Sequence, residues 1–184
     1  VYVGNYKIFP YQALKVIKNT LVNFGNPNYK KYSEYYRYSN LKNKLISDCP
    51  VGARTILILG QSNAANSVNT LTKKSEKHFM YFKGNCYKLS EPVLGATGNY
   101  SSITSELAEK INSTQPIIFL NNAWGGTSIT DWSKNNSPLS AYTNKNITDL
   151  YNNYKVKINY FVFIQGENDR FSYSNKKINY SKHF

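Results

Sequence analysis

The sequence has few residues of the kinds that hold disulfide-rich scaffolds and metal sites together. Its 184 residues include two cysteines, Cys49 and Cys86, and two histidines. Two cysteines are too few for a disulfide scaffold, and their spacing does not match a metal motif. The pair either forms one disulfide in an oxidising compartment or remains as two buried thiols.

Long apolar runs are also missing. No stretch approaches about 18 consecutive apolar residues, so the sequence predicts no membrane-spanning helix. No stretch has the pattern of a signal peptide either, yet the sequence begins at Val1 rather than at Met. We therefore expect that a segment was removed upstream and that the protein is exported, to the periplasm, the cell envelope or the outside of the cell.

Acidic residues are scarce, because 10 Asp and Glu stand against 23 Lys and Arg, and the net charge is +13. Such a charge attracts acidic partners, including glycans, anionic lipids and nucleic acids. The lysines are scattered rather than grouped, which favours an ordinary solvated surface over association with an acidic cell-envelope surface. The sequence contains no zinc-finger, helix-turn-helix or ribonucleoprotein signature, so we expect no nucleic-acid partner.

The sequence does contain three short apolar runs with the features of buried strands. Each run is followed by a polar loop that contains glycine, and helical patterns lie between the runs. This order is typical of βαβ units, in which parallel strands end at one edge of a sheet and ligands bind there. We expect an α/β fold whose parallel strands lie near residues 55–59, 117–121 and 160–165.

Residues 1–53 differ from the rest, and we expect them to form an N-terminal helical arm on a main domain of residues 54–184. Apolar residues between Leu14 and Leu21 recur at helical spacing. In the main domain we expect a helix capped by Ser101-Ser102 and a second helix capped by Asn146. We expect the second helix to cover residues 147–155, and loops to lie at 121–129 and 133–146. The stretch at 66–94 is expected to be irregular except for a short strand at 79–82.

The loop after the first strand places a serine where a nucleophile is needed. Gly60 ends the strand, Ser62 follows in a sharp turn, and Ala64-Ala65 is suited to open a helix. A helix N-terminus presents backbone N–H groups to a developing negative charge. Ser62 is thus a candidate nucleophile with half of an oxyanion hole in its own turn, although an ordinary turn has the same pattern.

Four blocks of the sequence, taken together, resemble the SGNH (GDSL-like) hydrolase superfamily, and in particular its sialate O-acetylesterase and carbohydrate acetyl esterase branch. The resemblance covers roughly residues 55–170. It implies a three-layer, flavodoxin-like fold with a parallel sheet. The blocks are Gly-Gln-Ser-Asn at 60–63, a glycine before a helix at Gly98 or Gly95, Gly-Gly-Thr-Ser-Ile at 125–129, and Gln-Gly-Glu-x-Asp at 165–169.

The resemblance also implies a role for each block. Ser62 is the nucleophile, and the Ser62 N–H, the Gly98 N–H and the Gln165 side-chain amide form the oxyanion hole. From the residues alone, Gln165 also fits an amide that bonds backbone groups at the end of a strand. Gly98 also fits a simple helix-entry turn if Gly95 is the true match. The residues expected to shape the loops are Gly126, Thr127, Glu167 and Asp169.

The sequence departs from this family in the last block. The family completes its catalytic triad with an Asp-x-x-His block near the C-terminus, whereas here Tyr180 occupies the place of the aspartate before His183. His78 precedes the second block, a position that the family does not use. We therefore expect the sheet to lack its C-terminal part and neither histidine to touch Ser62, with His183 as the candidate base if one reaches it. The 184-residue chain should then be almost inactive, and a version extended to include Asp-x-x-His should be active.

The leading hypothesis is a serine esterase that removes O-acetyl groups from carbohydrate through an acetyl-Ser62 intermediate, without a metal or other cofactor. A transferase that passes the acetyl group to a glycan would use the same residues. The alternative from a different class is a non-catalytic glycan-binding domain that keeps the pocket and lacks the base. Trp124, Trp132 and the tyrosines are candidates for stacking on sugars, although packing is the favoured role of Trp124.

Overall fold

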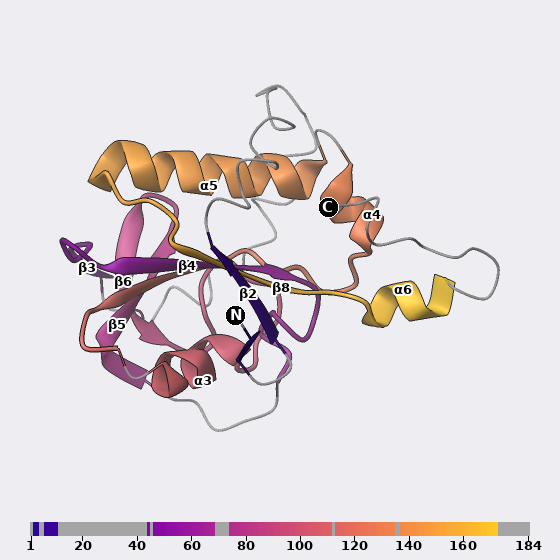
Figure 1. Ribbon diagram of the computed structural model, residues 1–184, viewed down its shortest axis with the longest axis horizontal. Helices are drawn as coiled ribbons and strands as arrows, with labels where there is room; N and C mark the ends of the chain where they lie inside the picture. Colours follow the sequence, from indigo (N-terminus) through magenta and orange to yellow (C-terminus); the bar gives the residue numbers. More distant parts are fainter. Residues whose placement is uncertain are drawn as a thin grey trace.

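The computed structural model (Figure 1) describes residues 2–3, 6–10, 44, 46–68, 74–111, 113–134 and 137–172. Within these residues, eight strands form a sheet with the order β1-β2-β8-β4-β7-β5-β6-β3. The strands are β1 (Tyr2–Val3), β2 (Tyr6–Pro10), β3 (Ile46–Ser47), β4 (Arg54–Gly60), β5 (Lys74–Phe82), β6 (Asn85–Ser90), β7 (Ile117–Asn121) and β8 (Tyr160–Ile164).

The centre of the sheet is parallel and its two margins are antiparallel. β4 pairs in parallel with β7 and with β8, and β7 pairs in parallel with β5. β2 pairs antiparallel with β8 at one margin, and β6 pairs antiparallel with β5 at the other. The three strands expected from apolar runs are β4, β7 and β8, and their parallel pairing is confirmed. The chain is therefore a mixed α/β protein, with antiparallel margins that the apolar runs did not indicate.

Helices cover both faces of this sheet. Along β4, Ile56 and Ile58 belong to one buried cluster, whereas Leu57 and Leu59 belong to another, because successive residues of a strand face opposite sides. Helix α3 (Ile103–Lys110) packs into the first cluster, and helix α5 (Pro138–Tyr154) contributes Leu150 to the second. The two helices lie on opposite sides of the sheet in Figure 1.

The start of α3 was predicted correctly, and the start of α5 was not. Ser102 caps α3, and its side chain accepts a hydrogen bond from the Thr104 N–H. α5 begins at Pro138 rather than near residue 147, because Ser137 is its N-cap and proline is favoured at the first helical position. The assignment of residues 133–146 to a loop was therefore wrong. Two short helices, α4 (Ile129–Ser133) and α6 (Glu167–Ser172), follow β7 and β8.

Residues 66–94, which we expected to be mostly irregular, contain a β-hairpin. β5 and β6 are joined by Lys83 and Gly84, whose φ angles are both positive, at 45° and 90°. A two-residue turn with two positive φ angles matches the twist of paired strands. The expected strand at 79–82 is present, and it is the end of the longer β5.

The described N-terminal residues add strands to both margins of the sheet. β1 and β2 form an antiparallel pair beside β8, and β3 pairs with β6. The helix expected between Leu14 and Leu21 lies outside the described residues. Cys49 and Cys86 form a disulfide, which is the first of the two arrangements that the sequence allowed. This bond ties the segment after β3 to β6.

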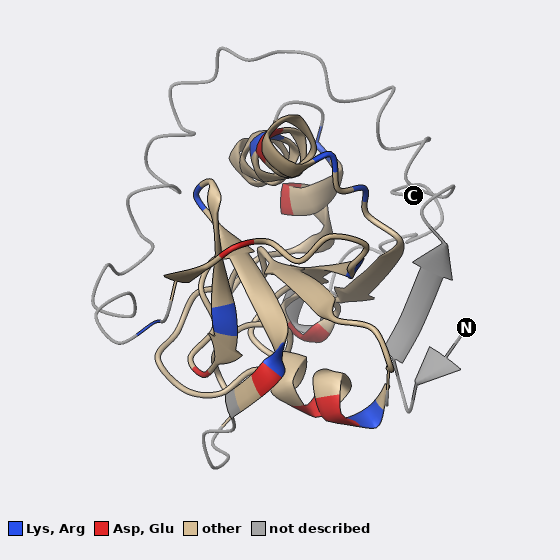
Figure 2. Cartoon of the chain, turned by 90° about the vertical axis from the view of Figure 1, so that its left-hand side faces the viewer, with Lys and Arg blue, Asp and Glu red and all other residues tan. Residues whose placement is uncertain are grey.

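Charged residues are spread over several elements of the described chain and are not gathered on one of them (Figure 2). This distribution agrees with the preference for an ordinary solvated surface. Among the described residues, no helix is long and apolar enough to cross a membrane.

Candidate functional site

The loops that follow β4, β7 and β8 meet at one edge of the sheet, because parallel strands end on the same side. The loop that carries Ser62 is bonded directly to both of the others. The Trp124 N–H donates to Gly60 O (2.8 Å), and the Gln61 N–H donates to Ile164 O (3.0 Å). The expected meeting of the three loops is therefore a property of the backbone as well as of the side chains.

Gly60 allows β4 to approach β8 more closely than any other residue would. Its φ is +129°, and a Cβ at this position would lie 1.9 Å from Ile164 O. A side chain therefore cannot be accommodated, and glycine alone fits both the space and the dihedral angle. The turn that carries Ser62 starts from this contact.

Ser62 lies in a tight turn rather than at the start of a helix. The N–H groups of residues 64–65 donate to Gln61 O at 2.9 and 3.1 Å, but the next residue leaves the helical path. The Asn66 N–H instead donates to Thr97 O (2.9 Å). The expectation of a helix after Ser62 is wrong, because buried Asn66 joins the loop that precedes α3.

Ser62 is partly exposed and lies beside the second glycine-rich loop. A Cβ on Gly125 would lie 4.0 Å from the Ser62 Cβ, so the missing side chain leaves room next to the serine. The Gly125 N–H donates to Thr97 Oγ1 (2.8 Å). Through this bond, the loop that leads to Gly98 reaches the same part of the edge.

Of the two candidate glycines in the second block, Gly98 is the better placed. Gly98 is exposed and forms a bridge with Asn66, and a Cβ there would lie 2.2 Å from Asn66 O. Gly95 is buried, and a Cβ there would lie 2.4 Å from Asn121 O. Both positions have positive φ and need glycine, but only Gly98 is on the accessible side of its loop.

Gly126 and Thr127 lie in the loop after β7, and the Thr127 side chain forms hydrogen bonds with two tryptophans. The Thr127 hydroxyl donates to Trp124 O (2.7 Å) and accepts a hydrogen bond from the Trp132 Nε1–H (3.0 Å). Gly126 has a φ of +76°, and its carbonyl accepts a hydrogen bond from Asn168 (3.0 Å). Both tryptophans pack against buried clusters, which is consistent with a packing role.

The Gln165 amide is surrounded by acceptors from three parts of the edge. Its Nε2 lies 2.7 Å from Thr127 O, 3.1 Å from Gln61 Oε1 and 3.3 Å from Asp169 Oδ2. An amide nitrogen carries two hydrogens, so these three acceptors already occupy it. The Gln165 Oε1 is buried and has no hydrogen-bond partner among the described residues. In this arrangement Gln165 bonds the loops together. This matches the role that the residues alone allowed, an amide that bonds backbone groups at the end of a strand.

Asp169 and Glu167, on α6, accept hydrogen bonds from different loops. Asp169 is fully buried, and its carboxylate accepts from the Ile129 N–H, at the first residue of α4 (3.1 and 3.2 Å). Glu167 is exposed and accepts from the side chains of Gln61 and Asn63. Both carboxylates therefore join loops to one another.

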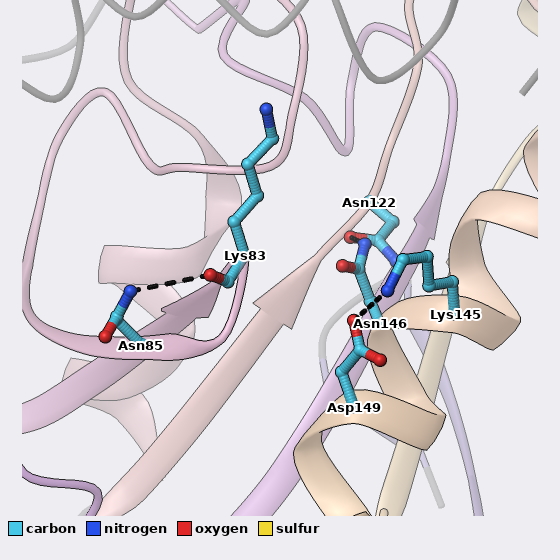
Figure 3. Close-up of polar contacts among 6 residues, drawn as sticks. All are labelled: Lys83, Asn85, Asn122, Lys145, Asn146 and Asp149. Carbon is cyan, nitrogen blue, oxygen red and sulfur yellow. Dashed lines mark hydrogen bonds and ion pairs between the residues drawn. The ribbon is translucent and has the colours of Figure 1, made fainter. Parts of the chain in front are cut away.

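Asn146, which we expected to cap a helix, lies inside α5 and points toward the edge of the sheet. Figure 3 shows its side chain beside Asn122, which follows β7, and the Asn146 Nδ2 donates to Asn122 Oδ1 (3.3 Å). Both side chains are buried. This contact ties the long helix to the loop that contains Gly125.

His78 lies far along the sheet from the Ser62 turn. Its Nδ1 accepts a hydrogen bond from the Ile117 N–H (3.2 Å), at the start of β7, whereas Ser62 follows the end of the neighbouring strand. Its ring packs edge-on against Phe119, and burial, followed by the charge of Lys77, lowers its pKa. This position agrees with the expectation that His78 does not touch Ser62, and His183 lies outside the described residues.

Two residues that support the site were missed from the sequence. Asn66 is fully buried, and its side chain bonds the backbone of Val93 (2.8 and 2.9 Å). Glu91 is 8% exposed and accepts from the hydroxyls of Ser102 (3.0 Å) and Ser105 (2.7 Å). Burial raises the pKa of Glu91, and the hydrogen bonds oppose that shift. Neither residue belongs to a recognisable sequence motif, so no local signal indicated them.

Within the described residues, no group of three or more His, Cys, Asp or Glu side chains is arranged to hold a metal ion. No protein-family model matches the chain, and no curated protein matches it.

Proposed function

We propose that this chain is a serine esterase of the SGNH type that removes O-acetyl groups from carbohydrate. The observation that carries the proposal is the position of Ser62, in a tight turn at the carboxyl end of a central parallel strand, beside the space left by Gly125. The four blocks of the family resemblance support it, because three of them meet around that turn and the fourth, at Gly98, adjoins it. The finer assignment, a flavodoxin-like SGNH fold, is part of the same proposal.

In the proposed reaction, the Ser62 Oγ attacks the acetyl carbonyl carbon and forms a tetrahedral intermediate. The negative charge on its oxygen is met by the backbone N–H groups of Ser62 and Gly98. Collapse of the intermediate releases the sugar hydroxyl and leaves acetyl-Ser62. Water then attacks the acetyl group and releases acetate. A general base must take the Ser62 proton and give it to the leaving sugar oxygen, and then take a proton from the attacking water and return it to Ser62. His183 is the candidate in this sequence.

Gln165 is the proposed third donor to the oxyanion, and the contacts of its amide suggest how it becomes available. The bond from its Nε2 to Gln61 Oε1 is dispensable, because the Asn168 N–H also donates to that oxygen at 3.1 Å. Gln165 can therefore exchange this acceptor for the oxyanion while Gln61 keeps a partner. The exchange costs little free energy, because no buried acceptor is left without a hydrogen bond.

We also propose that the protein is exported. The Cys49–Cys86 disulfide supports this, because disulfides persist in oxidising compartments. The proposed substrate is an O-acetylated glycan.

The decisive experiment replaces Ser62 and compares the variant with the unmodified protein. Ser62→Ala should lower kcat on p-nitrophenyl acetate and on an O-acetylated glycan by about 10³-fold or more. A fluorophosphonate probe should label Ser62. The matched control is Ser67→Ala, an exposed serine just past the turn, which should keep full activity.

Full activity of Ser62→Ala, or labelling of a different serine, would remove the proposed nucleophile. Glycan binding without turnover by the unmodified protein would instead support a non-catalytic glycan-binding domain.

A further inference from the structure

A single carboxylate bonds the residues on both sides of Ser62. The Gln61 Nε2 donates to one oxygen of Glu167, and the Asn63 Nδ2 donates to the other. The serine is therefore bracketed by two side chains that share one acceptor group on α6. Hydrogen bonds to an ionised carboxylate are stronger than those between neutral groups.

The two donors differ in how much else holds them. Gln61 is 2% exposed, and its Oε1 accepts from the Gln165 Nε2–H and the Asn168 N–H, both at 3.1 Å. Asn63 is exposed. Its side chain therefore depends on Glu167 for its orientation much more than that of Gln61 does.

We propose that Glu167 is a positioning residue for Ser62. It holds the turn at residues 61–63 against the start of α6, so that the Ser62 hydroxyl and its N–H keep one direction relative to the Gln165 amide. This inference rests on the proposed esterase function, and it assigns Glu167 a specific effect on the nucleophile beyond shaping a loop. Misplacement of a reacting group by about 1 Å can lower the rate by up to about 10²-fold. The two hydrogen bonds to Glu167 therefore affect the rate of the chemical step by fixing the position of Ser62.

Glutamine is the informative replacement at this position. A carboxylate accepts hydrogen bonds at both oxygens, whereas an amide accepts at its oxygen and donates at its nitrogen. In Glu167→Gln, an amide nitrogen that faces Gln61 sets one donor against another, and one that faces Asn63 requires Asn63 to turn its amide over. The side chain keeps nearly its size, so packing changes little, while neither donor any longer bonds an ionised carboxylate.

The experiment compares Glu167→Gln with Glu106→Gln. Glu106 is an exposed glutamate in the first turn of α3 and makes no part of the site. Glu167→Gln should lower kcat by about 10-fold to 10²-fold, with KM changed less than about twofold, and should slow fluorophosphonate labelling of Ser62 in proportion. Glu106→Gln should leave all three values unchanged.

A second measurement does not depend on activity. Backbone amide hydrogen exchange at residues 64–65, whose N–H groups donate to Gln61 O, should become faster in Glu167→Gln. Asn63→Ala removes one of the two bonds from an exposed position and should give a smaller change of the same kind. It replaces Glu167→Gln as the test if that variant does not fold.

The possible failures are distinguishable. If Ser62→Ala abolishes activity but Glu167→Gln leaves kcat, probe labelling and exchange unchanged, the role of Glu167 is wrong and the esterase proposal stands. If Ser62→Ala has no effect, the esterase proposal fails, and unchanged exchange at residues 64–65 in Glu167→Gln would then remove the bracket as well. A change confined to KM would make Glu167 a substrate-binding residue and overturn its positioning role.

Discussion

The turn that carries Ser62 is held on its two sides by different kinds of contact. On the side of α6, the amide side chains of its two neighbours donate to Glu167. On the side of α3, the backbone of Asn66 forms a bridge with Gly98. One side therefore depends on which side chains are present, and the other on how closely two backbones approach.

Each side also contains a carboxylate, and the two carboxylates differ in exposure. Glu167 is exposed and bonds side chains of the turn itself. Glu91 is 8% exposed and accepts hydrogen bonds from Ser102 and Ser105 at the start of α3, the helix that follows the loop of Gly98. The buried carboxylate supports a loop, whereas the exposed one contacts the neighbours of the candidate nucleophile.

This difference suggests that the two sides respond differently to substitution. A junction made of side-chain hydrogen bonds weakens in steps, because each bond contributes about 0.5–1.5 kcal/mol and can be lost alone. A junction made by close backbone approach has no such steps, because any side chain at the glycine overlaps the neighbouring carbonyl. The following predictions test this contrast.

The largest effect is expected for Gly98→Ala. A Cβ at this position would lie 2.2 Å from Asn66 O, and the φ of +97° is one that residues with a side chain rarely adopt. Backbone strain and overpacking each cost about 1–3 kcal/mol, so the free energy of unfolding should fall by about 2–6 kcal/mol. Chemical denaturation followed by circular dichroism measures this loss.

Gly126→Ala is the matched control for that variant. Gly126 also has a positive φ, +76°, but nothing lies within 4 Å of a Cβ placed there. Only the dihedral strain remains, and the loss should be about 1–2 kcal/mol. Equal losses in the two variants would show that the approach to Asn66 is not what makes Gly98 necessary.

On the side of α6, where side chains hold the turn, Gln165→Ala should mainly lower the catalytic rate. If its amide reaches the oxyanion, kcat should fall by about 10²–10³-fold with little change in KM, because the donor is needed in the transition state and not in the ground-state ester. Steady-state kinetics on p-nitrophenyl acetate gives both values. A loss of stability with unchanged kcat would assign Gln165 to loop bonding alone.

The smallest effect is expected from the titration of Glu91. Burial raises the pKa of this carboxyl in the folded chain, so the folded chain binds the proton more tightly than the unfolded chain. The stability that this provides is present below the unfolded pKa and is lost as the pH rises through the folded pKa. The free energy of unfolding of the wild type, relative to Glu91→Gln, should therefore decrease as the pH is raised from acidic values past the usual carboxyl range.

Denaturation curves at several pH values for both proteins measure that difference. A difference that stays constant with pH would mean that the hydrogen bonds from Ser102 and Ser105 fully offset the effect of burial on the pKa of Glu91.

Several elements were predictable because their signals are local. The apolar run at Ile56–Leu59 is buried in the centre of the sheet, and Ser102 caps α3 as expected. The start of α5 also has a local signal, because Ser137 is the N-cap and Pro138 occupies the first helical position, upstream of the Asn146 at which a helix was expected to begin. The two-residue turn of the hairpin was harder to recognise, because Lys83 is an unusual residue at a positive φ.

The sequence by itself determined the central strands, the order of the polar loops and the position of Ser62 directly after a buried strand. These follow from hydrophobic periodicity and glycine positions, which act over a few residues. Tertiary structure alone decided that Asn66 leaves the helical path to join the loop before α3, and that Glu167 brackets Ser62. Gln61 and Glu167 are separated by 106 residues, and their hydrogen bond exists only because β4 and β8 are neighbours in the sheet. Contacts of this kind depend on which strands pair, and no local pattern in a single sequence specifies that pairing.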